Sequence, residues 1–236
     1  MKPGLARVLS ILAIISLFAA CAKTKPGTNE SQQAKSVGGA GEGIGVYRAS
    51  EGKFYLRNSG TPGDAEYVFT YGVAKAGWLP VAGDWDGDGR STPGLYDPSR
   101  GLWFLRATNT PGDDSGISFT FGPPGVNWVP IAGDWDGDGK ATVGLYDPSR
   151  ALWFLRATNT PGDDKGVSFA FGIPGASGFL PVAGDWDGDG QDGVGLYNTA
   201  NNNWLLRNTL SDGNAELNFG FGFNDARPVA GHWQKR

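Results

Sequence analysis

Residues 80–106 read PVAGDWDGDGRSTPGLYDPSRGLWFLR, and residues 130–156 read PIAGDWDGDGKATVGLYDPSRALWFLR. A third copy opens at residues 181–197 with PVAGDWDGDGQDGVGLY and continues with NWLLR at residues 203–207. The copies recur about every 50 residues, a spacing that is typical of β-propeller blades and related repeat arrays. The sequence therefore predicts a chain built from one repeated structural unit.

Each copy contains four predicted strands separated by turn residues. In the second copy Asp-Pro-Ser-Arg at residues 147–150 has proline where a type I turn favours it, and Thr-Pro-Gly-Asp at residues 160–163 has the Pro-Gly centre of a type II turn. The composition agrees, because 39 glycines, 15 prolines and 12% aromatic residues indicate many turns joined by short strands. The predicted strands of this copy are residues 129–135, 143–146, 152–157 and 167–171.

The third strand of this copy has large apolar side chains on both of its faces. Trp153, Phe154 and Leu155 are consecutive, and consecutive residues of a strand point to opposite faces of its sheet. A sheet that is covered on both faces requires this pattern, as when propeller blades pack against their neighbours.

The two ends of the repeat region complement each other. Residues 45–47, 54–57 and 67–71 match the second, third and fourth strands of a copy, whereas residues 228–233, PVAGHW, match a first strand. Pairing them would complete a fourth unit without exposed strand edges. We therefore predict an all-β fold, a four-bladed β-propeller of four-stranded blades whose ring is closed by the C-terminal strand pairing with the N-terminal three-strand unit. The alternative is an open, stacked array in which those terminal strands remain edges.

The chemistry of the repeats lies in GDWDGDG, where aspartates occupy positions one, three and five of a tight loop and glycine occupies position six. Carboxylates at this spacing converge on one side of a curled backbone, and hard cations such as Ca²⁺ take such oxygen cages. The alternative is that Asp and Gly only build tight turns. The carboxylates predicted to bind up to three structural calcium ions are Asp84, Asp86 and Asp88, Asp134, Asp136 and Asp138, and Asp185, Asp187 and Asp189.

Position seven would contribute a backbone carbonyl, from Arg90, Lys140 or Gln191. These loops resemble FG-GAP and VCBS-type repeats, whose relatives form the calcium-binding propeller of integrin alpha subunits. That resemblance implies an acidic residue at position nine, where this chain has Thr92, Thr142 and Gly193. We expect a threonine hydroxyl, a backbone carbonyl or water to take its place. Position twelve is not acidic either, so the loop is not an EF-hand.

The N-terminus has the organisation of a bacterial export signal. A basic start is followed by an apolar run at residues 8–18 that is too short to span a bilayer, then by Ala19, Ala20 and Cys21. Residues 17–21, LFAAC, resemble a lipobox, which implies that Cys21 is lipidated and becomes the first mature residue. The membrane is then reached by acyl chains alone. The alternative is an ordinary signal peptide with a chance cysteine.

These features divide the chain into three parts: a lipoprotein signal peptide at residues 1–20, a tether at residues 21–42 and a repeat domain at residues 43–236. The tether is rich in Lys, Thr, Gly, Ser and Gln, and it has too few large apolar residues to form a core. We expect the protein in the bacterial cell envelope, at the outer membrane or cell surface. A net charge of −4 suits cation binding and gives no basic stripe for phosphates, so we do not expect nucleic acid as a partner.

No residue constellation predicts an enzyme. The chain has a single histidine, His232, and no GxSxG motif, while the Asp clusters recur as structural copies rather than as one acid and base pair. We therefore expect a non-enzymatic protein, with calcium in a structural role.

Two binding functions remain open. The family resemblance implies an interaction module for a protein or adhesive ligand at the cell surface. A carbohydrate-binding lectin is the alternative, because repeated aromatic faces beside arginine donors suit sugars. Packing between blades would explain the same aromatics. The sequence leaves open whether Trp85, Trp135 and Trp186, inside the loops, are wedges or exposed platforms. The candidate sugar-binding residues are Trp103 and Arg106, Trp153 and Arg156, and Trp204 and Arg207.

Overall fold

The computed structural model describes residues 44–57, 64–111, 116–162, 166–223 and 228. The predicted signal peptide, the tether and Cys21 lie outside the described residues. The described chain is all-β, and none of its residues belongs to a helix long and apolar enough to cross a membrane.

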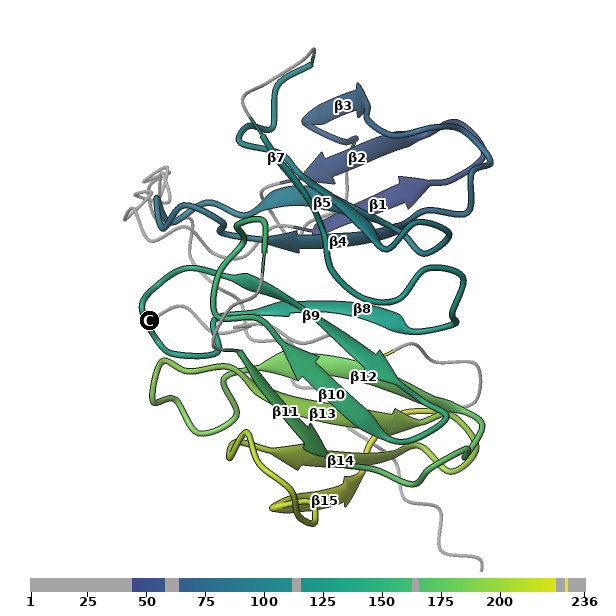
Figure 1. Ribbon diagram of the computed structural model, residues 1–236, viewed down its shortest axis with the longest axis vertical. Coiled ribbons are helices and arrows are strands. Elements are labelled where there is room, and N and C mark those ends of the chain that lie inside the picture. Colours follow the sequence, from purple (N-terminus) through teal and green to yellow (C-terminus); the bar gives the residue numbers. More distant parts are fainter. Residues whose placement is uncertain (1–43, 58–63, 112–115, 163–165, 224–227, 229–236) are drawn as a thin grey trace, which may run out of the picture. The chain divides into compact units, whose positions relative to one another are not determined.

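Four antiparallel sheets are arranged as a four-bladed β-propeller, and each sheet is a meander of strands consecutive in the chain (Figure 1). The first two sheets correspond to the N-terminal unit and the first full copy. Blade 1 consists of β1 Ile44–Arg48, β2 Lys53–Arg57 and β3 Tyr67–Thr70. Blade 2 consists of β4 Leu79–Gly83, β5 Thr92–Asp97, β6 Leu102–Leu105 and β7 Ile117–Thr120.

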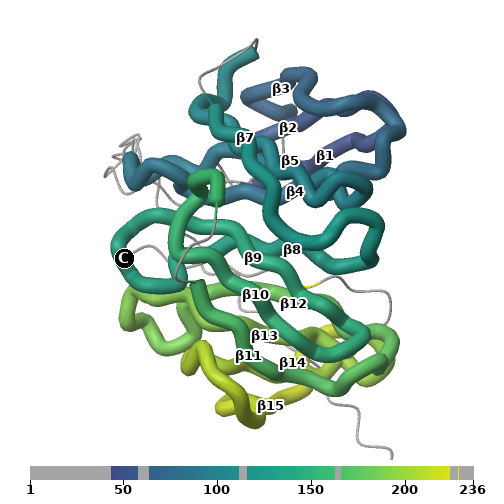
Figure 2. Tube along the Cα trace, viewed as in Figure 1, coloured from purple at the N-terminus to yellow at the C-terminus, as the bar shows by residue number. Residues whose placement is uncertain are grey.

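The other two sheets follow in the same order along the chain (Figure 2). Blade 3 consists of β8 Val129–Gly133, β9 Thr142–Asp147, β10 Leu152–Leu155 and β11 Val167–Ala170. Blade 4 consists of β12 Phe179–Gly184, β13 Gly193–Asn198, β14 Asn203–Arg207 and β15 Leu217–Gly220. The predicted all-β propeller fold is confirmed. The predicted closing strand at residues 228–233 lies outside the described residues except for Pro228, so blade 1 is described with three strands.

The hairpins follow from the turn chemistry in the sequence. Asp147 Oδ1 accepts hydrogen bonds from the backbone N–H and the hydroxyl of Ser149, at 2.9 and 2.6 Å, and this holds the turn between β9 and β10. Gly162 has a φ of 99°, the left-handed conformation that the predicted type II turn requires at its third residue. Asp163 lies outside the described residues.

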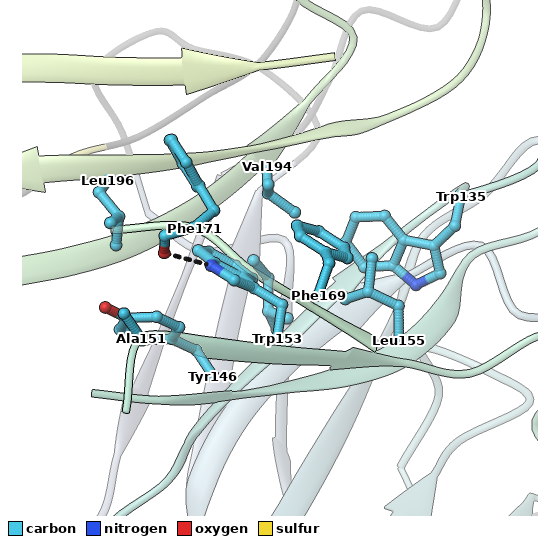
Figure 3. Close-up of a cluster of buried hydrophobic side chains, with 10 residues drawn as sticks. Trp135, Tyr146, Ala151, Trp153, Leu155, Phe169, Phe171, Val194 and Leu196 are labelled. Atoms are coloured by element: carbon cyan, nitrogen blue, oxygen red, sulfur yellow. Dashed lines mark hydrogen bonds between the residues drawn. The ribbon is translucent and has the colours of Figure 1, made fainter. Parts of the chain in front are cut away.

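The core lies between consecutive blades. Trp153 and Leu155 on β10 and Phe169 on β11 form one buried cluster with Val194 and Leu196 on β13 of the next blade (Figure 3). Equivalent clusters join blade 2 to blade 3 and blade 1 to blade 2. The other face of β10, with Phe154, is half-buried. The face with Trp153 and Leu155 therefore joins neighbouring blades as predicted, and Phe154 on the other face stacks on Trp128, with their ring centres 4.8 Å apart.

Candidate metal sites

The three Asp-rich loops connect the first and second strands of blades 2, 3 and 4. Asp84 directly follows β4, Asp134 follows β8 and Asp185 follows β12. The first strands of successive blades contact one another, β4 with β8 and β8 with β12. The repeat register therefore places all three loops at the same end of these adjoining strands.

The aspartates of each loop converge as the sequence predicted. In each triad the carboxylate oxygens lie within 4.8 Å of one another, with the first aspartate half-buried and the other two exposed. Three carboxylates at this separation repel one another unless a cation or protons reduce their charge. Each loop could therefore hold one metal ion. The triads are Asp84, Asp86 and Asp88; Asp134, Asp136 and Asp138; and Asp185, Asp187 and Asp189.

Backbone hydrogen bonds hold the first aspartate in place. Asp84 Oδ1 accepts from the N–H groups of Gly87 and Asp88, at 2.8 and 3.2 Å, and Oδ2 accepts from the N–H of Gly89 at 2.7 Å. The two glycines have φ of 80° and 83°, which side chains disfavour. The other loops repeat this network. The first aspartate therefore builds the turn in addition to contributing to the triad.

The residues at position seven are held by the triads through their backbone. The N–H of Arg90 donates to Asp88 Oδ1 at 2.8 Å, and Lys140 and Gln191 make the same bond to Asp138 and Asp189. Each of these residues therefore lies at the edge of its carboxylate cluster.

The threonines at position nine have structural partners. Thr92 in β5 donates its hydroxyl to the carbonyl of Arg106 at 2.7 Å, and Thr142 in β9 does the same to Arg156. These bonds tie the second strand of the blade to the end of the third. The interpretation that a threonine oxygen completes a cation site stays a prediction.

The tryptophan at position two packs inward. Trp85 and Trp135 are buried. A Cβ atom added to Gly83 would lie 2.7 Å from Trp85 Cζ3, and one added to Gly133 would lie 2.6 Å from Trp135 Cη2. Each indole therefore covers the glycine that ends the preceding strand. Trp85 and Trp135 therefore pack as wedges in the core, whereas Trp186 is half-buried.

Neighbouring loops contact each other directly. The N–H of Asp192, at position eight of the third loop, donates to the carbonyl of Asp134 at 2.6 Å, and Asp192 Oδ2 accepts from the N–H of Asp134 at 2.9 Å. Gln191 Nε2 also donates to the carbonyl of Asp136 at 3.2 Å. Asp192, which the sequence placed one position short of the expected acidic ligand, therefore fastens its loop to the preceding one.

Two of the three candidate sugar-binding tryptophans lie in the core. Trp103 and Trp153 are fully buried, and the indole N–H of Trp103 donates to the carbonyl of Phe121 at 3.0 Å. The indole N–H of Trp153 donates to the carbonyl of Phe171 at 2.9 Å (Figure 3). Trp204 makes the equivalent bond to the carbonyl of Phe221 at 2.8 Å and is partly buried. Trp103 and Trp153 therefore have no exposed ring face in this structure.

The arginines paired with these tryptophans are also buried and structural. Arg106 donates to the carbonyls of Thr108 and Thr110, at 3.1 and 2.7 Å, and Arg156 does the same to Thr158 and Thr160. Arg207 donates to the carbonyls of Ser211, Asn214 and Asp212. All three order the loop before the fourth strand of their blade. These guanidinium groups therefore have hydrogen-bond partners within their own blades.

The sequence did not single out two buried carboxylates as ionisable groups. Burial opposes the ionisation of Asp97, but hydrogen bonds from Ser99 and Arg100 outweigh it and hold the pKa of this carboxyl below its ordinary value. The pKa of Asp147 is lowered in the same way. Each carboxylate caps a hairpin turn, and the signal for it was the repeated Asp-Pro-Ser-Arg.

Comparison with protein-family models, curated proteins and solved structures found no match to this chain.

Proposed function

We propose that this chain is a calcium-stabilised β-propeller of the FG-GAP or VCBS type, which a lipid anchor on Cys21 holds at the bacterial cell surface as a binding module. The observation that carries the proposal is the convergence of three aspartates in each of three equivalent loops. A single DxDxDG sequence is a weak indication of metal binding, but three loops with the same geometry are a stronger one.

Calcium suits these triads better than zinc or copper. All side chains of the triads offer oxygen only, and Ca²⁺ accepts six to eight oxygen ligands in flexible geometry. Two aspartates of each triad are exposed, so water can complete the shell. The loops contain no His or Cys, the side chains that favour zinc or copper.

A structural role for the ion follows from the position of the loops. Each joins two neighbouring strands of one blade and contacts the loop of an adjacent blade. An ion there would fasten a turn and favour the folded state by mass action. The ions would then stabilise the propeller, and the surface of the propeller would bind a protein or adhesive ligand.

Thermal unfolding with calcium, magnesium or chelator tests the metal proposal. We expect calcium to raise the melting temperature, because an ion at 100 times its dissociation constant adds about 2.7 kcal/mol per site. A matched variant with Asp86, Asp136 and Asp187 changed to Asn should fold without this response. An unchanged melting temperature of the original protein at millimolar calcium would exclude structural calcium.

Separate measurements test the anchor and the ligand. In the native bacterial host, radiolabelled palmitate should label the original chain and not Cys21→Ser. The purified chain should bind envelope or host-matrix proteins in calcium and lose binding in chelator. If the chain bound a glycan array instead, the ligand would be a sugar. If the Arg207→Gln variant kept that binding, the sugar site would lie elsewhere on the surface.

A further inference from the structure

The two ends of the propeller carry different loops. In blades 2 to 4 the second strand, for example β9, begins after an Asp-rich loop and ends at the hairpin turn that leads to the third strand. The six residues of β9 span about 20 Å. Because the strands of a blade are antiparallel, the fourth strand ends on the same side as this turn. The hairpin turns and the connections between blades therefore lie at the end opposite the aspartate triads.

Hydrogen bonds join the hairpin turn of a blade to the connection that follows its fourth strand. In blade 2 the N–H of Gly125 donates to the carbonyl of Pro98 at 2.8 Å. Blades 1 and 3 have the equivalent bonds, from Lys75 to Ala49 at 2.8 Å and from Gly175 to Pro148 at 3.0 Å. We name this part of the surface the hairpin end, which consists of residues 48–53, 71–78, 97–101, 121–128, 147–151, 171–179, 198–203 and 221–223.

One repeated position of the hairpin end exposes an apolar residue in every blade. Val73 in blade 1 and Ile173 in blade 3 are each 56% exposed, and Phe223 in blade 4 is 74% exposed. Pro123, at the same position in blade 2, is exposed as well. A single exposed apolar residue is ordinary on a protein surface, but a set that recurs at one end indicates a surface that contacts an apolar partner.

The exposed charges of the hairpin end are mainly positive. Two of its three acids, Asp97 and Asp147, are buried. The arginine bonded to each of them has a side chain that is 56% exposed. The aspartate triads at the opposite end are negative, so the two ends of the propeller differ in charge. The charged residues of the hairpin end are the cations Arg48, Lys53, Lys75, Arg100 and Arg150 and the acids Glu51, Asp97 and Asp147.

Aromatic rings hold two of these arginines in place. The guanidinium carbon of Arg150 lies 5.5 Å from the ring centre of Trp128 and 5.9 Å from that of Phe154. In blade 2 the guanidinium carbon of Arg100 lies 5.8 Å from the ring centre of Trp78. A cation beside an aromatic ring at this distance is attracted by the negative face of the ring. Each arginine is therefore supported from below while its side chain remains exposed.

We propose that the hairpin end docks on the surface of an anionic lipid bilayer. Val73, Ile173 and Phe223 enter the boundary between head groups and acyl chains, and the exposed cations pair with lipid phosphates. A bilayer is the partner because the charges of this end complement phosphates, and because the apolar residues lie on separate blades, where a fluid surface accommodates each of them singly. The inference depends neither on calcium nor on lipidation of Cys21, and it directs the aspartate triads away from the membrane.

Fluorophores at single cysteines test which end meets the bilayer. In a Cys21→Ser background of the full chain, Ile173→Cys and Val167→Cys are each labelled with the environment-sensitive dye nitrobenzoxadiazole. Val167 is the matched control, because it is 42% exposed at the start of β11, whereas Ile173 follows the end of the same strand. With vesicles of phosphatidylcholine and phosphatidylglycerol, we expect the label at position 173 to brighten several-fold and the label at position 167 to stay unchanged.

The N-terminal apolar run is present in every variant, so its own affinity for lipid does not distinguish the two labels. An equal response of both labels would overturn the proposal, and so would an equal response to vesicles of phosphatidylcholine alone. No response at Ile173 would leave an acidic protein as the partner of this end, and the proposal would be wrong. As a second measurement, Val73→Ser with Phe223→Ser should reduce the response at position 173 several-fold. The control pair Val68→Ser with Leu217→Ser, which are exposed apolar residues of fourth strands, should leave it unchanged.

Discussion

The backbone N–H of Ala141 donates a 2.7 Å hydrogen bond to the carbonyl of Asp84, so position eight of the second loop is joined to position one of the first. The carbonyl of the same peptide group belongs to Lys140, the residue predicted to ligate an ion in the second loop. One planar peptide therefore connects two candidate sites. The bond from Asp192 to Asp134 repeats this link between the second and third loops.

This peptide predicts coupling between adjacent loops. An ion that draws on the Lys140 carbonyl polarises the peptide and strengthens the bond that its N–H makes to the first loop. With the third loop disabled by Asp187→Asn and Asp189→Asn, we expect the first two loops to bind calcium with about twofold positive cooperativity in a calorimetric titration. With the second loop disabled by Asp136→Asn and Asp138→Asn, the remaining loops should bind independently. Equal cooperativity in both variants would contradict the peptide link.

The aspartates of one loop should separate turn building from metal binding. Asp84 accepts three backbone hydrogen bonds, whereas Asp86 accepts one, from Asp88 at 3.3 Å. In chelator, Asp84→Ala should lower the free energy of unfolding by about 1–3 kcal/mol, because it leaves N–H groups without their acceptor. Asp86→Ala should have little effect in chelator but should remove the calcium response of that loop. Urea unfolding with and without calcium measures both, and equal losses in chelator would assign the two residues the same role.

A buried tyrosine predicts loss of stability in alkali. Burial, aided by the charge of Asp147, raises the pKa of Tyr146 from 10.0 to about 12. Between these values the unfolded chain loses the proton and the folded chain keeps it, so stability falls as pH rises. Urea unfolding between pH 9 and 12 should show a shallower fall in Tyr146→Phe than in the original protein, by up to about 1.4 kcal/mol per pH unit. Parallel curves for the two proteins would mean that Tyr146 ionises equally in both states.

The sequence predicted the strands because each copy repeats the same apolar segments between the same turn residues. The triads were predictable too, since loop geometry depends on local spacing and on glycines such as Gly87. The roles of Trp103 and Arg106 were not, because an aromatic and an arginine suit a sugar site as well as a core. Their burial depends on the neighbouring blade, which local pattern does not describe. The exposure of Phe219 could not be foreseen for the same reason, since its repeat equivalents are buried by a following blade.

The residue that follows each Asp-Pro-Ser-Arg turn predicts a difference between blades 2 and 3. Gly101 and Ala151 occupy the same position, with φ of 63° and 55°. A Cβ added to Gly101 would lie 2.4 Å from the carbonyl oxygen of Gly122, whereas blade 3 already accommodates the methyl group of Ala151. Gly101→Ala should therefore lower the free energy of unfolding by about 1–3 kcal/mol, from backbone strain and from the displaced carbonyl.

Ala151→Gly is the reciprocal control. It removes the strain of an alanine in the left-handed conformation, but glycine adds freedom to the unfolded chain, which costs about 1 kcal/mol. The net change in the free energy of unfolding should therefore be within about 1 kcal/mol of zero. Urea unfolding of the two variants and the original protein measures both changes. The carbonyls of Ala151 and Gly101 accept equivalent hydrogen bonds, from the N–H groups of Phe171 and Phe121. If Gly101→Ala were as well tolerated as the native alanine of blade 3, the closer packing in blade 2 would have no energetic consequence.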